Sequence, residues 1–230
     1  MSRARHKYQT RHTAAANETI RASGCLSSYL LPPFAVLFVG ALLAIFAFNS
    51  SGQAVSARAS SSTNTVISQI FTPEIQYWNS SISRWASASN LDPNLVAVVM
   101  QIESCGNPSA RSGAGAMGLF QVMPYHFEAA DDPYDPDTNA ARGLGYLKRS
   151  LTTSNNNVRL ALAGYNGGIS VISIGEWFWA AETSRYVYWG SGIYEDTLTS
   201  AAQSARLKEW LNAGGTSLCN QAKQKLGIND

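Results

Sequence analysis

The sequence predicts a mainly α-helical domain behind an N-terminal membrane anchor. Apolar residues recur at spacings of three and four through residues 73–88, 92–103 and 138–151, which is the pattern of helices with one buried face. No segment alternates like a β-strand, and no internal repeat is present. A further segment, residues 30–48, is almost wholly apolar and is roughly long enough to cross a bilayer.

Charges around the apolar segment predict its orientation. No charged residue lies between Arg21 and Arg58, and the residues before the segment are basic. The positive-inside rule therefore places residues 1–25 in the cytoplasm, residues 26–48 in the membrane and the remainder outside. The alternative is a cleaved signal peptide, because the small residues around Ala57 suit a signal peptidase. Both interpretations export the rest of the chain.

Composition divides the exported part into a linker and a domain. Residues 49–72 are rich in Ser, Ala, Thr and Asn, so we expect a flexible tether. Residues 73–230 remain as one folded domain. The chain is 45% hydrophobic with a net charge of +2, and its exported part is near neutral. The lack of a basic stripe interleaved with aromatic residues argues against a nucleic-acid partner.

The helix expected over residues 92–103 carries a candidate general acid. Asp92 is expected to cap this helix, and Pro93 suits its first position. Glu103 shares a face with apolar residues and lies in the last turn, where the helix dipole disfavours negative charge. Both influences raise the pKa of a carboxyl group, which suits proton donation. The alternative is a solvated Glu at a frayed helix end.

Local signals place the other helices. A helix from Pro73 to about Ala88 carries Trp78 and Trp85 on an apolar stripe, which we expect in the core rather than against a ligand. Asp137 is expected to cap the helix that follows it. The remaining helices are expected from Asn155–Asn157 to Gly167–Gly168, over 181–189 and over 199–213, with a last turn around Cys219.

Two clusters of polar residues bear on metals and disulfides. Residues 125–136 contain Glu128, Asp131, Asp132 and Asp135 but lack the glycine and closing Glu of a calcium loop, so we expect a solvated loop and no metal. Cys25 precedes the apolar segment, whereas Cys105 and Cys219 both lie on the exported side. Their even number and their compartment predict that Cys105 and Cys219 pair. The alternative is two free buried thiols.

A glycine-rich loop follows Glu103 and ends at a helix-stopping proline. Its residue types and spacing resemble the first two motifs of the soluble-lytic-transglycosylase family, goose-lysozyme-like enzymes that cleave peptidoglycan. The matching residues of this stretch are Glu103-Ser104, Pro108, Ala110, Ser112, Gly115-Ala116, Gly118-Leu119, Gln121 and Met123-Pro124. Further matches follow in the family's order at Asn139, Gly143 and Tyr146-Leu147, at Ala161–Gly168, and at Glu182-Thr183 with Tyr186-Val187. The resemblance covers about residues 84 to 195.

The resemblance implies a lysozyme-like fold and cleavage of the β-1,4 bond between N-acetylmuramic acid and N-acetylglucosamine. Glu103 would be the single general acid/base, and the muramic acid's own 6-hydroxyl would close onto C1 to give a 1,6-anhydro product. Such substrate-assisted chemistry is an exception to the usual pair of carboxylates. No second acid lies near Glu103 in the sequence, although residues 125–136 could approach it in space.

The resemblance also implies roles for other residues. Gln121 and Met117 would line the sugar cleft, while Tyr165 and Asn166 would position Glu103 and the substrate. The alternative for Tyr165 is a packed core aromatic. Ser112 is a further substrate-binding candidate, and the supporting candidates are Ser104, Glu182 and Tyr186. Ser104 as a nucleophile is disfavoured because no triad pattern surrounds it.

Two other functions remain open: a hydrolytic lysozyme of the same fold and a non-catalytic scaffold that binds peptidoglycan. The expected partners are glycan strands of peptidoglycan and the membrane, through one N-terminal helix. No cofactor is implied. The expected location is the bacterial cell membrane with the domain outside, and the physiological role, the protein partners and the oligomeric state stay unassigned.

Overall fold

The computed structural model describes residues 67–199 and 202–228, and every regular element within them is helical. The α-helices are α2 (Pro73–Tyr77), α3 (Asn79–Ser89), α4 (Pro93–Ser104), α5 (Pro136–Thr153), α6 (Val158–Gly167), α7 (Ala181–Thr197), α8 (Ala205–Trp210) and α9 (Thr216–Leu226). Shorter helical turns are η1 (Pro124–His126), η2 (Ile169–Ser173), η3 (Glu176–Phe178) and η4 (Leu211–Gly215). Extended pairing in this part of the chain amounts to two isolated bridges, Arg111 with Met117 and Met117 with Val122. The predicted mainly α-helical class is confirmed.

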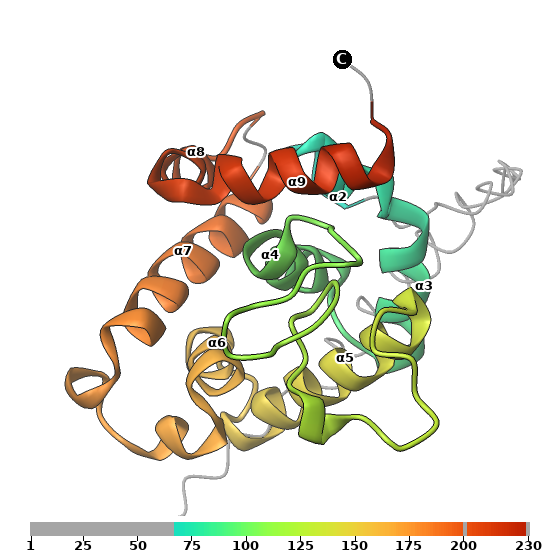
Figure 1. The fold of residues 1–230 in the computed structure, drawn as a ribbon. Coiled ribbons are helices and arrows are strands. Elements are labelled where there is room, and N and C mark those ends of the chain that lie inside the picture. Colours follow the sequence, from blue (N-terminus) through green and yellow to red (C-terminus); the bar gives the residue numbers. More distant parts are fainter. Residues whose placement is uncertain (1–66, 200–201, 229–230) are drawn as a thin grey trace, which may run out of the picture. The chain divides into compact units, whose positions relative to one another are not determined.

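Helix α4 lies at the centre of the described residues, with the other helices around it (Figure 1). The Asp92 side chain caps its start by accepting a hydrogen bond from the backbone of Asn94 at 2.8 Å. Every residue from Leu95 to Ile102 is buried, and α3, α7 and α9 pack against the helix. A helix that is apolar on all sides is stable only inside a core. Glu103 is therefore held at the end of the most buried element.

The core begins before the expected domain boundary. Ile67 and Phe71 are buried. The side-chain oxygen of Gln101, in α4, accepts a hydrogen bond from the backbone of Thr72. The expectation of a tether up to residue 72 is therefore wrong from residue 67 onward, because this segment has enough apolar side chains to join the core.

The first predicted helix is broken at Trp78. Helix α2 ends at Tyr77 and α3 begins at Asn79, where one continuous helix was expected. The indole N–H of Trp78 donates a hydrogen bond to the carbonyl oxygen of Gly106 at 2.9 Å, and its ring stacks on Trp85. The break thus lets Trp78 hold the loop that follows α4. Trp85 is buried, as expected of a core residue.

Helix α5 begins earlier than predicted. Asp135, and not Asp137, is its cap, because the Asp135 side chain accepts a hydrogen bond from the helix backbone at 2.8 Å. Pro136 occupies the first helical position, which proline favours. The residue before it, Asp135, is therefore the cap, and Asp137 lies inside the helix. The Asp137 carboxylate instead accepts hydrogen bonds from the side chains of Arg84 and Trp85. Asp137 therefore ties α5 to α3.

The C-terminal helices differ most from the prediction. Helix α7 continues to Thr197 instead of ending near residue 189, and the single helix expected over 199–213 is wrong. Helix α8 instead runs into the turn η4, where Gly214 has φ 127°, and α9 then carries Cys219. Such a φ is accessible at little cost only to glycine, so Gly214 is where the chain changes direction between α8 and α9.

None of the helices in the described ranges is long and apolar enough to cross a membrane. The chain divides into two units, residues 1–58 and residues 59–230, and all described residues belong to the second. The expected cytoplasmic tail (residues 1–25) and anchor (residues 26–48) lie outside the described residues. Both stay predictions.

Candidate active site

Glu103 has the properties of a proton donor at neutral pH. It is half-buried at the end of α4, and this burial raises its pKa from 4.5 to about 8. The Tyr186 hydroxyl acts in the opposite direction and lowers the pKa, whereas the negative charge of Glu182 raises it further. A carboxyl group with a pKa near 8 carries its proton at pH 7. It can therefore protonate a leaving group without an acidic medium.

Tyr186, on α7, is the buried neighbour of Glu103. Burial and the charge of Glu103 raise the pKa of the Tyr186 phenol well above 10. Its hydroxyl is close enough to influence Glu103, yet it has no partner of full hydrogen-bond geometry within the described ranges. A buried hydroxyl without a partner is costly, so each instance calls for an explanation. We interpret it as a donor that binds Glu103 when the carboxylate forms.

Glu103 lines a cavity of about 330 Å³ beside α7. The lining residues are Ile102, Glu103, Asn166, Glu182, Arg185, Tyr186, Trp189 and Trp210. Glu182 is exposed in the first turn of α7, where the helix dipole favours a negative charge. It is the carboxylate that shares this cavity with Glu103. The acidic residues of 125–136 do not line the cavity.

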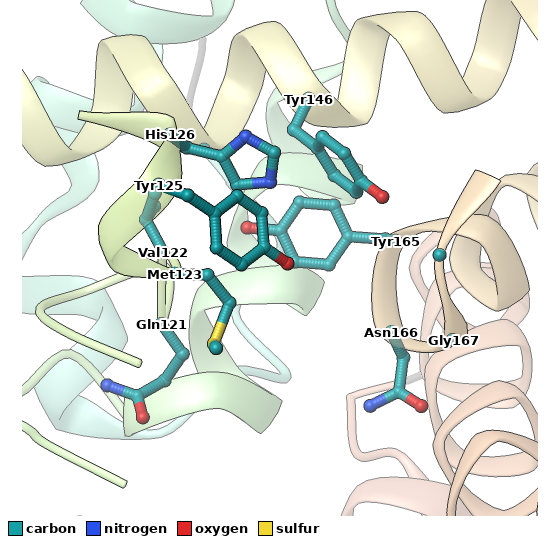
Figure 2. Close-up of a pocket in the computed structure, with 11 residues that line it drawn as sticks. Gln121, Val122, Met123, Tyr125, His126, Tyr146, Tyr165, Asn166 and Gly167 are labelled. Atoms are coloured by element: carbon teal, nitrogen blue, oxygen red, sulfur yellow. The ribbon is translucent and has the colours of Figure 1, made fainter. Parts of the chain in front are cut away.

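A second cavity, of about 220 Å³, adjoins the first at Asn166, which lines both. Its other lining residues are Gln121, Val122, Met123, Tyr125, His126, Gly143, Tyr146, Tyr165, Gly167 and Gly168. Figure 2 shows Gln121 and Asn166 on opposite sides of this cavity, with four aromatic rings gathered along its remaining wall. Successive ring centroids from Tyr125 through His126 and Tyr146 to Tyr165 lie 4.5, 4.7 and 5.7 Å apart. Aromatic surface with a few polar groups is typical of a ligand pocket.

Two amide side chains supply polar contacts in the second cavity. The side-chain oxygen of Asn166 accepts a hydrogen bond from the Thr183 hydroxyl at 2.9 Å, so its NH₂ group remains for a ligand. The NH₂ group of Gln121 donates to the backbone carbonyls of Ala110 and Gly118, which leaves its oxygen. One amide thus offers a donor and the other an acceptor. An acetamido group requires both.

The loop that carries Gln121 is held in a strained conformation. Gln121 has φ 45°, which lies in the left-handed region that residues other than glycine rarely adopt. Residues held in this strained conformation cluster at functional sites. Asn139, buried in α5, accepts a hydrogen bond from the backbone of Phe120 and donates one to the carbonyl of Met117. Gly118 allows this close approach, because a Cβ there would lie 2.3 Å from the Asn139 amide. Asn139 therefore stabilises the strained loop.

Tyr165 supports the same loop rather than binding Glu103. Its hydroxyl donates a hydrogen bond to the carbonyl of Phe120 at 2.7 Å. Gly143 permits this close approach, because a Cβ there would lie 2.6 Å from the Cβ of Phe120 and 3.2 Å from that hydroxyl. Burial raises the pKa of Tyr165 well above 10, and the charge of Glu103 adds to the effect. Tyr165 is thus near Glu103, but its hydroxyl donates its hydrogen bond to the loop.

Ser104 has a structural role. It is buried, its hydroxyl donates to the carbonyl of Leu119 at 2.7 Å, and the same oxygen accepts from the backbone of Gly106. Among the residues that the structure describes, no base bonds to this hydroxyl, so the geometry does not support a nucleophile.

Two predicted substrate-binding residues lie away from both cavities. The Ser112 hydroxyl accepts a hydrogen bond from the backbone of Ala116 at 2.9 Å. Met117 is the shared residue of the two isolated bridges. Both shape the loop and line neither cavity. Met123 lines the second cavity instead.

Several lining residues were not identified from the sequence. In the second cavity these are Met123, Tyr125 and His126; in the first they are Arg185, Trp189 and Trp210. Tyr146 and Met123 were noted only as matches to the family's pattern, without a place in the site. The aromatic wall comes from η1, α5 and α6, so no spacing in the sequence connects its members. Among its members only Tyr165 was predicted as a site residue, through its family motif.

A disulfide joins Cys105 to Cys219 and so ties α9 to the end of α4. The Glu74 carboxylate is buried nearby, and one of its oxygens and the two sulfurs lie within 4.8 Å of one another. Sulfurs in a disulfide are not thiolates, which are the form that binds metals. We therefore interpret this cluster as a structural link behind Glu103.

Comparison with known proteins shows what this chain is similar to. Residues 80–182 match the family model of the Transglycosylase SLT domain. Over these residues the chain is thus similar to that domain. The chain is 39% identical over 114 residues to the "Transglycosylase" of Enterobacteria phage PRD1. This alignment covers 49% of this chain and 40% of the phage protein.

Other relatives carry related names. Over 117 residues the chain is 29% identical to the "Membrane-bound lytic murein transglycosylase E" of Buchnera aphidicola subsp. Acyrthosiphon pisum, covering 43% of this chain and 53% of that protein. This chain thus spans about half or less of the length of these two curated relatives. A solved inactive mutant of the lytic transglycosylase Slt from Pseudomonas aeruginosa aligns with a TM-score of 0.38 and 21% identity, over 65% of this chain and 24% of that one.

Proposed function

We propose that this chain is a peptidoglycan lytic transglycosylase with Glu103 as its single general acid/base. The observation that carries the proposal is a carboxyl group with a pKa of about 8, in a cavity that adjoins a second, aromatic-lined cavity, within an SLT domain. The names of the relatives agree with this reaction class.

The reaction would proceed in two proton transfers. Protonated Glu103 donates its proton to the oxygen that links N-acetylmuramic acid to N-acetylglucosamine, and the bond from that oxygen to C1 breaks. The Glu103 carboxylate then takes the proton of the muramic acid's 6-hydroxyl as its oxygen bonds to C1. The product is a 1,6-anhydro sugar, and no water is consumed. Tyr186 stabilises the carboxylate between the two steps by donating a hydrogen bond.

Gln121 and Asn166 would position the sugar. Their free amide groups face one cavity from opposite sides and together match an acetamido substituent (Figure 2). The aromatic wall would contact the apolar faces of the sugar ring. Positioning of this kind is what makes an intramolecular attack by the 6-hydroxyl fast.

A hydrolytic lysozyme is the second candidate, and Glu182 favours it. This carboxylate lines the same cavity as Glu103 and is close enough to raise its pKa. A second carboxylate could activate water, which is the usual arrangement in glycosidases. The two functions therefore differ in the role of Glu182.

Mass spectrometry of digested peptidoglycan tests the proposal. The wild type should release anhydro-muropeptides, Glu103→Gln should release none, and Glu182→Gln should retain the anhydro product. Glu128→Gln, in the acidic loop, is the matched control. Reducing-end products that vanish with Glu182→Gln would indicate the hydrolase. Intact binding without any product would indicate the non-catalytic scaffold.

We also propose that residues 26–48 anchor the protein in the membrane with the SLT domain outside. The support is the uncharged apolar segment and its basic flank. The full chain should stay with membranes after alkaline carbonate extraction, and a variant lacking residues 26–48 should not. Release of the full chain, cut near Ala57, would indicate the cleaved signal peptide instead.

A further inference from the structure

A third cavity, of about 200 Å³, lies next to the aromatic-lined one and shares part of its wall. His126 and Tyr146 line both cavities. The other lining residues of the third cavity are Ala141, Arg142, Gly145 and Arg149. A ligand in the aromatic-lined cavity would therefore have a neighbouring compartment with two guanidinium groups.

One of these two cations is neutralised within the fold. The Arg142 guanidinium donates two hydrogen bonds to the Asp131 carboxylate, at 2.7 and 3.1 Å. It also forms an ion pair with Glu128 at 2.9 Å. These carboxylates raise the pKa of Arg142. Arg142 is thus committed to holding the acidic loop against α5.

Arg149 is the cation that remains available. No carboxylate within residues 67–199 and 202–228 forms an ion pair with it, and its side chain is exposed. Its guanidinium lies 4.8 Å from the ring centroid of Tyr146, which is within the range of a cation–π contact. This contact places the cation beside Tyr146, which lines both cavities.

His126 does not compete for an anion in this compartment. Burial lowers the pKa of the imidazole, and the positive charge of Arg149 lowers it further. The ring is therefore neutral at pH 7, and the free positive charge of the compartment belongs to Arg149. The influence of Arg149 on His126 also indicates that the two side chains are close.

We propose that Arg149 binds a carboxylate carried by the muramic acid whose sugar ring occupies the adjoining aromatic-lined cavity. The inference rests on the proposed function and adds a subsite to it. A guanidinium matches a carboxylate with paired hydrogen bonds. The carboxylate has two possible sources, the lactyl group of a peptide-free muramic acid and the peptide attached to that lactyl group. Both are absent from chains made only of N-acetylglucosamine.

Binding to the inactive Glu103→Gln variant tests the proposal without cleavage. The probes are soluble glycan with attached peptides, the same glycan with a free lactyl carboxylate after peptide removal, and a chito-oligosaccharide of similar length. Adding Arg149→Gln should weaken binding of a carboxylate-bearing glycan about 3- to 10-fold, which is the effect of one charge-assisted contact at a partly exposed site. Binding of the chito-oligosaccharide should not change. Loss with the peptide-free muramic-acid probe alone assigns the lactyl carboxylate, and loss with the peptide-bearing probe alone assigns a carboxylate of the peptide. Loss with both probes shows that Arg149 accepts a carboxylate from either source.

Lys148→Gln is the matched control, because it removes the same charge from the adjacent position of α5, outside the cavity. It should leave all three affinities unchanged, and Arg149→Lys should keep part of the preference for carboxylates. Equal losses on every probe, or no loss with Arg149→Gln, would overturn the proposal. If the wild type cleaves no peptidoglycan, the proposed function fails, but the binding comparison still decides the role of Arg149.

Discussion

At the scale of single residues, the pKa of Glu103 couples reactivity to stability. The ordinary pKa of a glutamate carboxyl group is 4.5, whereas the pKa of Glu103 in the folded protein is about 8. Between these pH values the unfolded chain binds fewer protons than the folded one, so the stability of the wild type falls as pH rises from about 4.5 to about 8. Glutamine does not titrate and therefore avoids this loss.

We therefore expect Glu103→Gln to be more stable than the wild type at pH 8, by about 1–3 kcal/mol, and equally stable at about pH 4. Urea denaturation at both pH values measures the difference. The control is Glu182→Gln, which removes an exposed carboxylate and should change stability little. A Glu103→Gln variant that is less stable than the wild type at pH 8 would contradict the raised pKa.

The neighbours of Glu103 should shift the alkaline limb of the activity profile in opposite directions. In the proposed mechanism the reaction starts from protonated Glu103, so kcat/KM should fall as pH rises through about 8. Tyr186 lowers this pKa and Glu182 raises it. Tyr186→Phe should therefore move the limb to higher pH, and Glu182→Gln to lower pH. Shifts in the same direction would show that these groups do not act through Glu103.

At the scale of elements, the disulfide fixes α9 behind the end of α4. It closes a loop between residues that are 114 positions apart, which restricts the unfolded chain strongly. Replacing Cys105 and Cys219 by serine should lower the free energy of unfolding by about 2–5 kcal/mol. Denaturation with and without a reductant measures this, and Cys25→Ser is the control. Equal stability of the double variant and the oxidised wild type would count against a stabilising disulfide.

The loop that carries Gln121 depends on Gly118. This glycine has φ 74°, and a Cβ would collide with the Asn139 amide. Gly118→Ala should cost about 1–3 kcal/mol of stability and reduce activity at least tenfold, because the loop positions Gln121. Gly113→Ala is the matched control, since nothing lies within 4 Å of a Cβ there. The two variants are compared by thermal unfolding and by muropeptide release, and similar effects would argue against the Asn139 brace.

The sequence was sufficient for elements with strong local signals and misleading where signals compete. Asp92 and Pro93 predicted the start of α4 correctly, because the cap and the proline agree. Asp137 was chosen as a cap although Pro136 favours Asp135. Trp78 fits an uninterrupted helix in the sequence, but the helix is interrupted at this residue, whose indole donates a hydrogen bond to the loop at Gly106. Tertiary contacts of this kind have no signature in local spacing.

At the scale of the whole described domain, the site is assembled from segments far apart in the sequence. Glu103 comes from α4, Gln121 from the loop after it, Asn166 from α6, and Glu182 and Tyr186 from α7. Motif spacing pointed to these five residues. It did not predict that Glu103 and Gln121 line different cavities joined at Asn166, or that Tyr165 bonds to the loop. Such geometry depends on how helices pack and not on their order.

The central claim is that the muramic acid's own 6-hydroxyl, and not water, attacks C1. Digestion of peptidoglycan in water labelled with heavy oxygen, followed by mass spectrometry of the muropeptides, tests this directly. The account predicts products one water lighter than hydrolysis products, without the label, and absent with Glu103→Gln. Labelled reducing ends formed by the wild type would contradict the account and would identify a hydrolase.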